Sequence, residues 1–320
     1  MTDNRIVTVT LHPVLERTLV AHYLAVGYQN QAQEAERLDP SGAGVNIARA
    51  LHRLGADVHA LVLLGDDAVG RAYGGLLAEY GFESTVLHVQ GATPSDTCIL
   101  DTGSDQETHL LARGAAVDQG VVQQVLRALV GIVEPGNTVV LAGPLPPGAP
   151  EDVYARLVDA VQGAGARAVL AASGPALDAA LPARPSLVIL NQVECEGFCN
   201  YPVRVLDDVV SCAQRLRGQG AGAALIEMGR ADRALLAGDE GRWLVELPGE
   251  AQGTSTGIWE ATLAGYLAGR LARQPIPASL ELGAAAAGYA ADEVGAAFGS
   301  PAEVEEYRPG VEVRPVEDGE

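Results

Sequence analysis

The stretch 253–270, G-T-S-T-G-I-W-E-A-T-L-A-G-Y-L-A-G-R, joins a small polar loop to the start of a helix. The helix is predicted from apolar residues that recur at helical spacing: Leu263, Tyr266, Leu267 and Leu271. A loop that opens into a helix N-terminus presents unpaired backbone N–H groups and the positive end of the helix dipole, which suits an anion such as phosphate. Glu260 falls in the first turn, where a carboxylate is favoured and could act as a base. The stretch therefore predicts an anion site beside a proton acceptor.

Two other polar motifs lie where predicted elements begin or end. Residues 41–46, S-G-A-G-V-N, form a Gly-rich turn before a helical pattern, and on its own such a turn is usually no more than a helix start. Asn191 and Glu194 follow the apolar strand predicted at 187–190. Their spacing suits either a functional polar pair or an ordinary helix cap, and the spacing alone leaves both readings open.

At these residues the chain resembles the PfkB family of sugar kinases, which has the ribokinase-like fold. The second signature of that family, (D/N)-T-x-G-A-G-D, aligns so that its last four positions fall on Gly257, Ile258, Trp259 and Glu260. The resemblance implies that Glu260 is the catalytic base and that Gly257 and Trp259 occupy phosphate-binding positions. Trp259 brings a side chain of roughly 200 Å² to a position where a glycine lets the backbone meet the phosphate.

The sugar-binding motifs of the family are matched in part. The first signature, G-G-K-G-x-N, implies that Gly42, Gly44 and Asn46 bind substrate, but Ala43 stands at its lysine position. The motif N-P-(A/S)-(I/L)-D implies a sugar contact that falls here on Glu16. Glu16 keeps the carboxylate but moves it by roughly 1.5 Å, which degrades a close-fitting site.

The phosphate-contacting segment of the family, T-R-T-N-x-K, falls on residues 93–98. Pro94 and Cys98 occupy its arginine and lysine positions, and Asp96 adds a negative charge. Two cations are lost and one anion is gained, so the segment is expected to repel a second phosphate.

The nucleotide-side motifs are altered too. The resemblance to K-P-N-x-x-E implies that Asn191 and Glu194 organise phosphate and the water shell of Mg²⁺, with Glu194 as the metal-side carboxylate. The family's S-L-G segment of the nucleotide pocket falls on Glu227 and Gly229, which places a negative charge close to the expected phosphates.

The loop 143–150, G-P-L-P-P-G-A-P, is similar to that of the 1-phosphofructokinase and tagatose-6-phosphate kinase branch. The resemblance implies Mg²⁺-dependent transfer of the ATP γ-phosphoryl group to a sugar or sugar phosphate, such as fructose 1-phosphate or tagatose 6-phosphate. Because several chemically important positions are changed, we expect weak or absent turnover and doubtful ATP binding. The alternative is a non-catalytic pseudokinase that binds a metabolite or a protein partner.

Strand-like and helix-like stretches alternate along the chain, which predicts an α/β fold with a doubly wound, mainly parallel sheet and helices on both faces. The family resemblance implies a ribokinase-like single domain, 1–320, with a small β lid formed by residues 14–38 and 93–112. A final helix is expected at 278–297 and an edge strand at 311–313. Because related kinases often pair through their lids, a homodimer is expected.

The composition restricts the partners. The net charge is −20 and all 21 basic residues are arginine, which argues against binding to nucleic acid or to an anionic membrane. No apolar run reaches the roughly 18 residues of a membrane span, and the N-terminus lacks the layout of a signal peptide. Four cysteines in a chain of 320 residues do not suggest a disulfide framework, so a reduced, cytoplasmic protein is expected.

Overall fold

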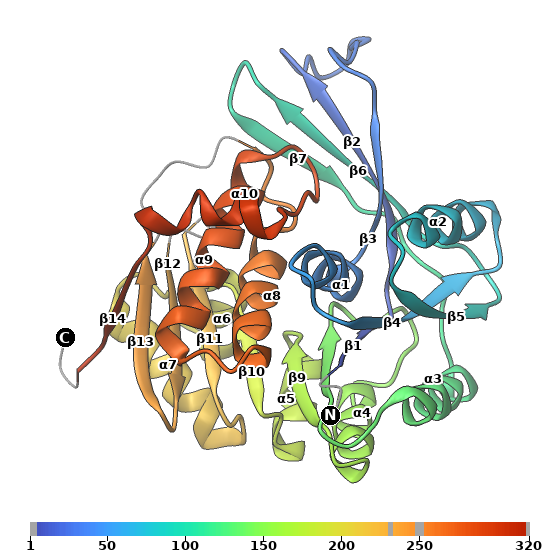
Figure 1. Ribbon diagram of the computed structural model, residues 1–320. Helices are drawn as coiled ribbons and strands as arrows, with labels where there is room; N and C mark the ends of the chain where they lie inside the picture. The colour runs from blue at the N-terminus through green and yellow to red at the C-terminus, as the bar shows by residue number, and fades with distance from the viewer. Residues whose placement is uncertain (1–4, 230–232, 247–252, 318–320) are drawn as a thin grey trace.

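Short, largely buried strands form the centre of the protein, which is described by a computed structural model for residues 5–229, 233–246 and 253–317 (Figure 1). Ten of them make one sheet in the order β14-β13-β12-β11-β10-β9-β8-β1-β4-β5. The pairs from β11 to β5 are parallel, and β12, β13 and β14 add antiparallel pairs at one edge. The bounds are β1 Ile6–Thr10, β4 Val58–Gly65, β5 Glu83–Val89, β8 Thr138–Ala142, β9 Arg167–Ala171, β10 Leu187–Leu190, β11 Ala224–Met228, β12 Arg233–Gly238, β13 Gly241–Glu246 and β14 Glu312–Pro315.

Helices cover both faces of this sheet, as Figure 1 shows, and each face has its own apolar core. One face carries α1 Ala43–Arg53, α2 Ala68–Glu79, α8 Ile258–Leu271, α9 Ile276–Asp292 and α10 Pro301–Glu305. The other carries α3 Gln119–Ile132, α4 Val153–Gly163, α5 Pro175–Ala180, α6 Gln192–Cys199 and α7 Leu206–Gln219. The predicted doubly wound α/β fold is confirmed, because parallel strands joined by helical crossovers bury both faces of the sheet.

Four further strands form a separate sheet, which we call the lid, in the order β3-β2-β6-β7. They are β2 Val14–Ala21, β3 Arg37–Ser41, β6 Ser95–Asp101 and β7 Gln106–Leu110. The lid projects from the main sheet above α1 and α8 (Figure 1). Its underside contains buried polar groups, among them Glu16, Thr18 and Asp39.

Close packing of α8 on α9 fixes the start of α8, where the sequence predicts the site. A Cβ atom on Gly265 would lie 2.7 Å from the Cα of Gly283, and one on Gly269 would lie 2.8 Å from the Cα of Ser279. The two helices therefore touch backbone to backbone, and any larger side chain at these glycines would push them apart.

The structure differs locally from the expected elements at three places. The sequence does not predict helix α6, because the Asn191 and Glu194 spacing at its start is equally typical of a functional polar pair and of a helix cap. Helix α9 ends at Asp292 rather than near 297, and Gly295 adopts a φ of 73° in the loop that follows. The predicted edge strand is present as β14, one or two residues later than expected.

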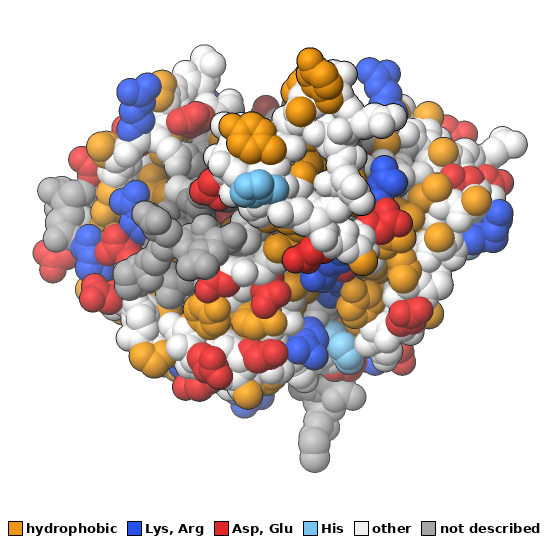
Figure 2. Space-filling model, turned by 90° about the horizontal axis from the view of Figure 1, so that it is seen from above, with side chains coloured by type: hydrophobic (Ala, Val, Ile, Leu, Met, Phe, Trp, Pro, Cys, Tyr) orange, Lys and Arg blue, Asp and Glu red, His pale blue; other side chains and the backbone are white. Residues whose placement is uncertain are grey.

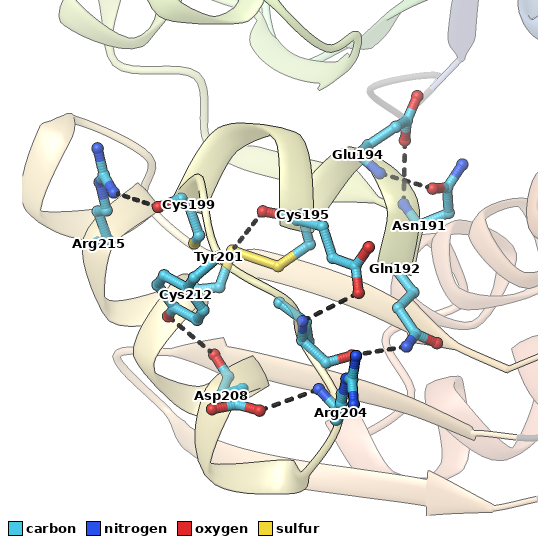
Figure 3. Close-up of a disulfide and its surroundings, with 12 residues drawn as sticks. Asn191, Gln192, Glu194, Cys195, Cys199, Tyr201, Arg204, Asp208, Cys212 and Arg215 are labelled. Atoms are coloured by element: carbon cyan, nitrogen blue, oxygen red, sulfur yellow. Dashed lines mark hydrogen bonds between the residues drawn. A yellow bond between two sulfur atoms is a disulfide. The ribbon is translucent and has the colours of Figure 1, made fainter.

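The expectation that the cysteines are unpaired is wrong at one place. Cys195 on α6 and Cys212 on α7 form a disulfide, with Cα atoms 6.6 Å apart (Figure 3). These residues are 17 positions apart and meet only because α6 and α7 pack against each other. Cys199, one turn along α6, is a buried free thiol.

Within the described residues, none of the helices is both long and apolar enough to cross a membrane.

Candidate active site

A cavity of about 390 Å³ lies beyond the carboxyl ends of β8, β9 and β10, against the first turn of α8. This is where ligands bind in open α/β sheets, because the loops after parallel strands and the helix N-termini converge there. The lining residues are Ala43, Gly143, Pro144, Ala171, Ala172, Ser173, Ile189, Leu190, Asn191, Glu194, Trp259 and Glu260.

Trp259 lines this cavity from the first turn of α8. Gly257, two residues before Trp259, has a φ of 92° and caps the helix. A Cβ on Gly257 would also lie 3.2 Å from the ring of Phe298, so glycine is required there for both reasons. The indole therefore stands beside the helix N-terminus that the sequence predicts as an anion site.

Glu260 lies on the same turn and is only 5 % exposed. Its Oε1 accepts a hydrogen bond of 3.2 Å from Nδ2 of Asn46, while its buried Oε2 has no partner. Burial raises the pKa of Glu260 to about 8, despite the hydrogen bond from Asn46, and the negative fields of Glu16 and Glu227 push it further in the same direction. At neutral pH this carboxyl group is mainly protonated.

Asn191 and Glu194 also line the cavity, but they are first of all a helix cap. The side chain of Asn191 accepts the N–H of Glu194 at 2.9 Å, and the carboxylate of Glu194 accepts the N–H of Asn191 at 3.0 Å. This reciprocal capping box begins α6. Of the two readings left open by the spacing, the structure thus realises the cap, and the pair keeps access to the cavity at the same time.

Glu227 and Gly229 are not part of the cavity lining. Glu227 is 7 % exposed on β11 and accepts a hydrogen bond from the hydroxyl of Thr262 on α8, and burial raises its pKa to about 7. The N–H of Gly229 donates to the side-chain oxygen of Gln192 at 3.1 Å. Both residues therefore hold the sheet and its neighbouring helices together.

The predicted sugar-binding glycines have a packing role. A Cβ on Gly44 would lie 2.4 Å from Oγ1 of Thr10, so glycine lets α1 lie directly on β1. Gly42 caps α1 with a φ of 113°. Asn46 reaches Glu260 across the α1–α8 contact, and Glu16 on the lid accepts a hydrogen bond of 3.1 Å from Thr256.

The loop before α8 already binds a carboxylate from within the chain. Glu107 of β7 accepts the N–H of Ser255 at 2.7 Å with one oxygen and the hydroxyl of Ser255 at 2.7 Å with the other. Sequence reasoning missed Glu107, because 148 residues separate it from Ser255 and only the folded lid brings them together.

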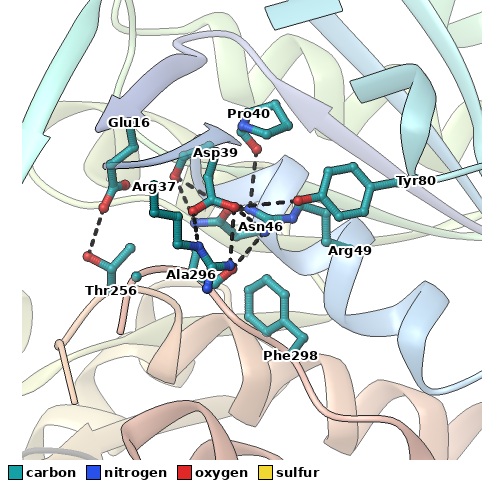
Figure 4. Close-up of polar contacts among 12 residues, drawn as sticks. Glu16, Arg37, Asp39, Pro40, Asn46, Arg49, Tyr80, Thr256, Ala296 and Phe298 are labelled. Atoms are coloured by element: carbon teal, nitrogen blue, oxygen red, sulfur yellow. Dashed lines mark hydrogen bonds and ion pairs between the residues drawn. The ribbon is translucent and has the colours of Figure 1, made fainter. Parts of the chain in front are cut away.

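Arg37 on lid strand β3 and Arg49 on α1 are engaged in structural ion pairs (Figure 4). Arg37 and Arg49 both contact Asp39, at 2.6 Å and 2.8 Å, and Arg49 also donates to the carbonyl of Ala296 at 2.7 Å. The side chain of Arg49 is 2 % exposed and stacks over the ring of Tyr80. These cations anchor the lid to the C-terminal loop instead of facing the cavity.

The residues present therefore do not fit a triphosphate. The described lining contains two carboxyl groups and no basic side chain. Seen from the lid side, the surface carries many acidic side chains, with basic ones scattered among them (Figure 2). Glu194 could hold the water shell of Mg²⁺, but none of the described lining residues beside it supplies a positive charge for phosphate oxygens.

Residues 15–303 match the pfkB family carbohydrate kinase domain, which is most of the chain. The chain belongs to the pfkB family. It is 32% identical over 269 residues to the 1-phosphofructokinase of Xanthomonas campestris, covering 83% of this chain and 84% of that protein. It is 29% identical over 278 residues to the 1-phosphofructokinase of Bacillus subtilis, covering 87% of this chain and 89% of that protein.

Solved pfkB structures share the whole fold. Phosphofructokinase-2 from Escherichia coli, in complex with substrates and products, superposes with a TM-score of 0.87 at 26% identity, covering 95% of this chain and 98% of that one. The ribokinase-like architecture expected from the sequence is thereby confirmed, and these three relatives are phosphofructokinases.

Replacing Glu260 by Gln should make the pfkB chain less sensitive to alkaline pH. Between the ordinary pKa of 4.5 and the folded value of about 8, the folded chain holds a proton that the unfolded chain has lost. The free energy of unfolding of the wild type must therefore fall as pH rises through this window. We expect Glu260→Gln to be more stable than wild type by roughly 3 kcal/mol at pH 8 and by much less at pH 5.

Urea denaturation at the two pH values measures this difference. Glu151→Gln, at an exposed position on the loop before α4, is the matched control and should leave the free energy of unfolding unchanged at both pH values. An equal effect of Glu260→Gln at both pH values would contradict the assigned titration.

Proposed function

We propose that this pfkB protein binds a sugar or sugar phosphate in the cavity beside α8 and transfers phosphoryl groups from ATP weakly or not at all. The observation that carries the proposal is Trp259, which lines the cavity from the first turn of α8, at a position where the family resemblance implies a glycine that lets the backbone meet phosphate.

The remaining phosphate-binding features are weakened as well. Ala43 and Ile189 line the cavity at two positions where the family resemblance places lysines. The N–H of Ser255 in the loop before α8 is occupied by Glu107. Positioning and electrostatics supply almost all the catalysis of phosphoryl transfer, so these losses act directly on the rate.

One observation favours an active kinase as the second candidate. The pKa of Glu260, about 8, lies close to neutral pH, so a fraction of the carboxyl group is deprotonated there and can accept a substrate proton at its unpartnered Oε2. A coupled assay of ADP release with fructose 1-phosphate and tagatose 6-phosphate separates the two candidates. If the protein is a non-catalytic pseudokinase, the cavity would bind a metabolite or the lid would bind a protein partner. The compartment that we propose is the cytoplasm.

We also propose that the protein is a homodimer joined through the outer face of the lid. Strand register places Leu38, Arg17, Thr97 and Leu110 in one row across that face. Leu38 is 43% exposed and Leu110 is 60% exposed, so the row offers apolar area that a second copy could cover.

Static light scattering at micromolar concentration should give twice the chain mass for the wild type. Leu38→Asp together with Leu110→Asp should halve that mass, because two charges would be buried in the interface. Val130→Asp, at an exposed apolar position on α3, is the control and should leave the mass unchanged. A wild-type monomer would contradict the proposal.

A further inference from the structure

Three metal-ligating side chains meet on the underside of the lid. Cys98 on β6 and His109 on β7 are directly opposed in the antiparallel register, and Glu107 lies two residues before His109 on the same face. The Sγ of Cys98, a carboxylate oxygen of Glu107 and a ring nitrogen of His109 all lie within 4.8 Å of one another. Cys98 is 1% exposed, while the side chain of His109 is 37% exposed and gives solvent access.

The contacts converge on a single atom. His109 Nε2 lies 3.0 Å from Oε2 of Glu107 and 3.9 Å from Sγ of Cys98. A Cys-His-carboxylate nucleophile needs the two ring nitrogens on opposite partners, with one facing the thiol and the other facing the acid. Here both partners face the same nitrogen, which is unsuited to a nucleophile and suited to a shared cation.

The spacing and the donor types fit one class of ion. Zinc binds cysteine, histidine and carboxylate ligands, and its bond lengths give tetrahedral edges of about 3.4 Å between N and O and about 3.6 Å between N and S. The observed separations of 3.0 Å and 3.9 Å differ from these by about 0.4 Å, within the reach of small side-chain rotations. A dication would also balance a thiolate and a carboxylate on a lid underside that already holds Glu16 and Asp39.

Glu107 links this cluster to the loop before α8. Its Oε1 accepts the N–H of Ser255 at 2.7 Å, which orients the carboxylate as an outer partner orients a metal ligand.

We propose that Cys98, Glu107 and His109 form a site for a zinc-class divalent ion on the underside of the lid, with a fourth position open to water or another oxygen ligand. A bound divalent ion would supply a positive charge in the lid segment 93–98, where the family resemblance implies a lysine at the position of Cys98. All three ligands come from the lid strands β6 and β7.

The test is a cobalt and zinc titration of the full-length, chelator-treated protein, without reductant so that the Cys195–Cys212 disulfide stays intact. Wild type should bind one ion per chain and show the near-ultraviolet thiolate-to-cobalt band. Cys98→Ser should abolish that band, and His109→Gln, at a partly exposed position that tolerates change, should weaken zinc binding by more than the roughly 10–100-fold that an outer-shell partner costs.

Cys199→Ser is the matched control, because Cys195, Cys199 and Cys212 form the other group of potential ligands among the described residues. This control should leave both the band and the zinc affinity unchanged. Absence of stoichiometric binding in the wild type, or loss of the band in Cys199→Ser with retention in Cys98→Ser, would overturn the proposal. None of these readouts uses ATP, so they are separate from any test of kinase activity.

Discussion

The unmodified chain should release ADP from MgATP and fructose 1-phosphate at less than about 0.01 s⁻¹. Protein kinases typically turn over at about 1–100 s⁻¹. Losing one preorganised donor to a developing negative charge costs about 10²–10³ in rate, and losing a well-placed general base costs about 10²–10⁴. Trp259 beside the helix N-terminus and the buried, mainly protonated Glu260 correspond to these two losses.

The two losses are not strictly additive, so the prediction takes the lower end of each range. A coupled ADP-release assay, run beside a working 1-phosphofructokinase as positive control, measures it. Glu260→Gln is the matched variant and should leave any residual rate unchanged, since Glu260 contributes little at neutral pH. Turnover of about 1 s⁻¹ with either sugar phosphate, abolished by Glu260→Gln, would refute the account.

Much of the fold follows from local patterns. Continuous apolar strands such as 58–64 and helical stretches such as 118–133 predict a covered parallel sheet, and the structure places β4 and α3 there. Short elements are harder to predict from the sequence. Helix α6 has eight residues, and its Asn-x-x-Glu start is typical of either a helix cap or a functional polar pair. Helix α9 ends earlier than its sequence predicts, because alanine-rich sequence continues beyond Asp292 while Gly295, with a positive φ, lets the chain leave the helix.

The site could be predicted residue by residue but not as a set of contacts. Asn191, Glu194, Trp259 and Glu260 come from two separate stretches, and the structure brings them to one cavity. The sequence does not tell which way the side chain of Trp259 points, and the structure places Trp259 in the cavity lining.

Contacts between distant elements were not accessible from sequence. The hydrogen bonds of Glu107 to Ser255 depend on how far the lid reaches over α8, and the Cys195–Cys212 disulfide depends on how α6 packs on α7. Neither relation leaves a periodic signal in the chain. The same holds for Cys98 and His109, which are brought together by strand register alone.

Loss of nucleotide binding is the second large effect that we expect. The chain uses arginine freely, yet none of the lysine positions at Ala43, Cys98 and Ile189 has become arginine. Two of these residues line the cavity, and the nearby Arg37 and Arg49 are paired with Asp39. MgATP should therefore bind with a dissociation constant weaker than about 1 mM, equivalent to less than about 4 kcal/mol of binding free energy.

Three substitutions should reopen the site. Ile258→Ala and Trp259→Gly remove the bulk beside the N-terminus of α8, and Glu260→Asp draws the carboxylate back by one methylene. Together they should restore measurable nucleotide binding even where turnover stays low, because exposed backbone N–H groups can then meet phosphate oxygens.

Calorimetric titration of MgATP into the wild type and this triple variant, side by side, tests the central claim that the phosphate site has been lost. The account predicts no saturable heat for the wild type and a measurable dissociation constant for the variant. A low-micromolar dissociation constant for the wild type, unchanged or weakened in the variant, would contradict it.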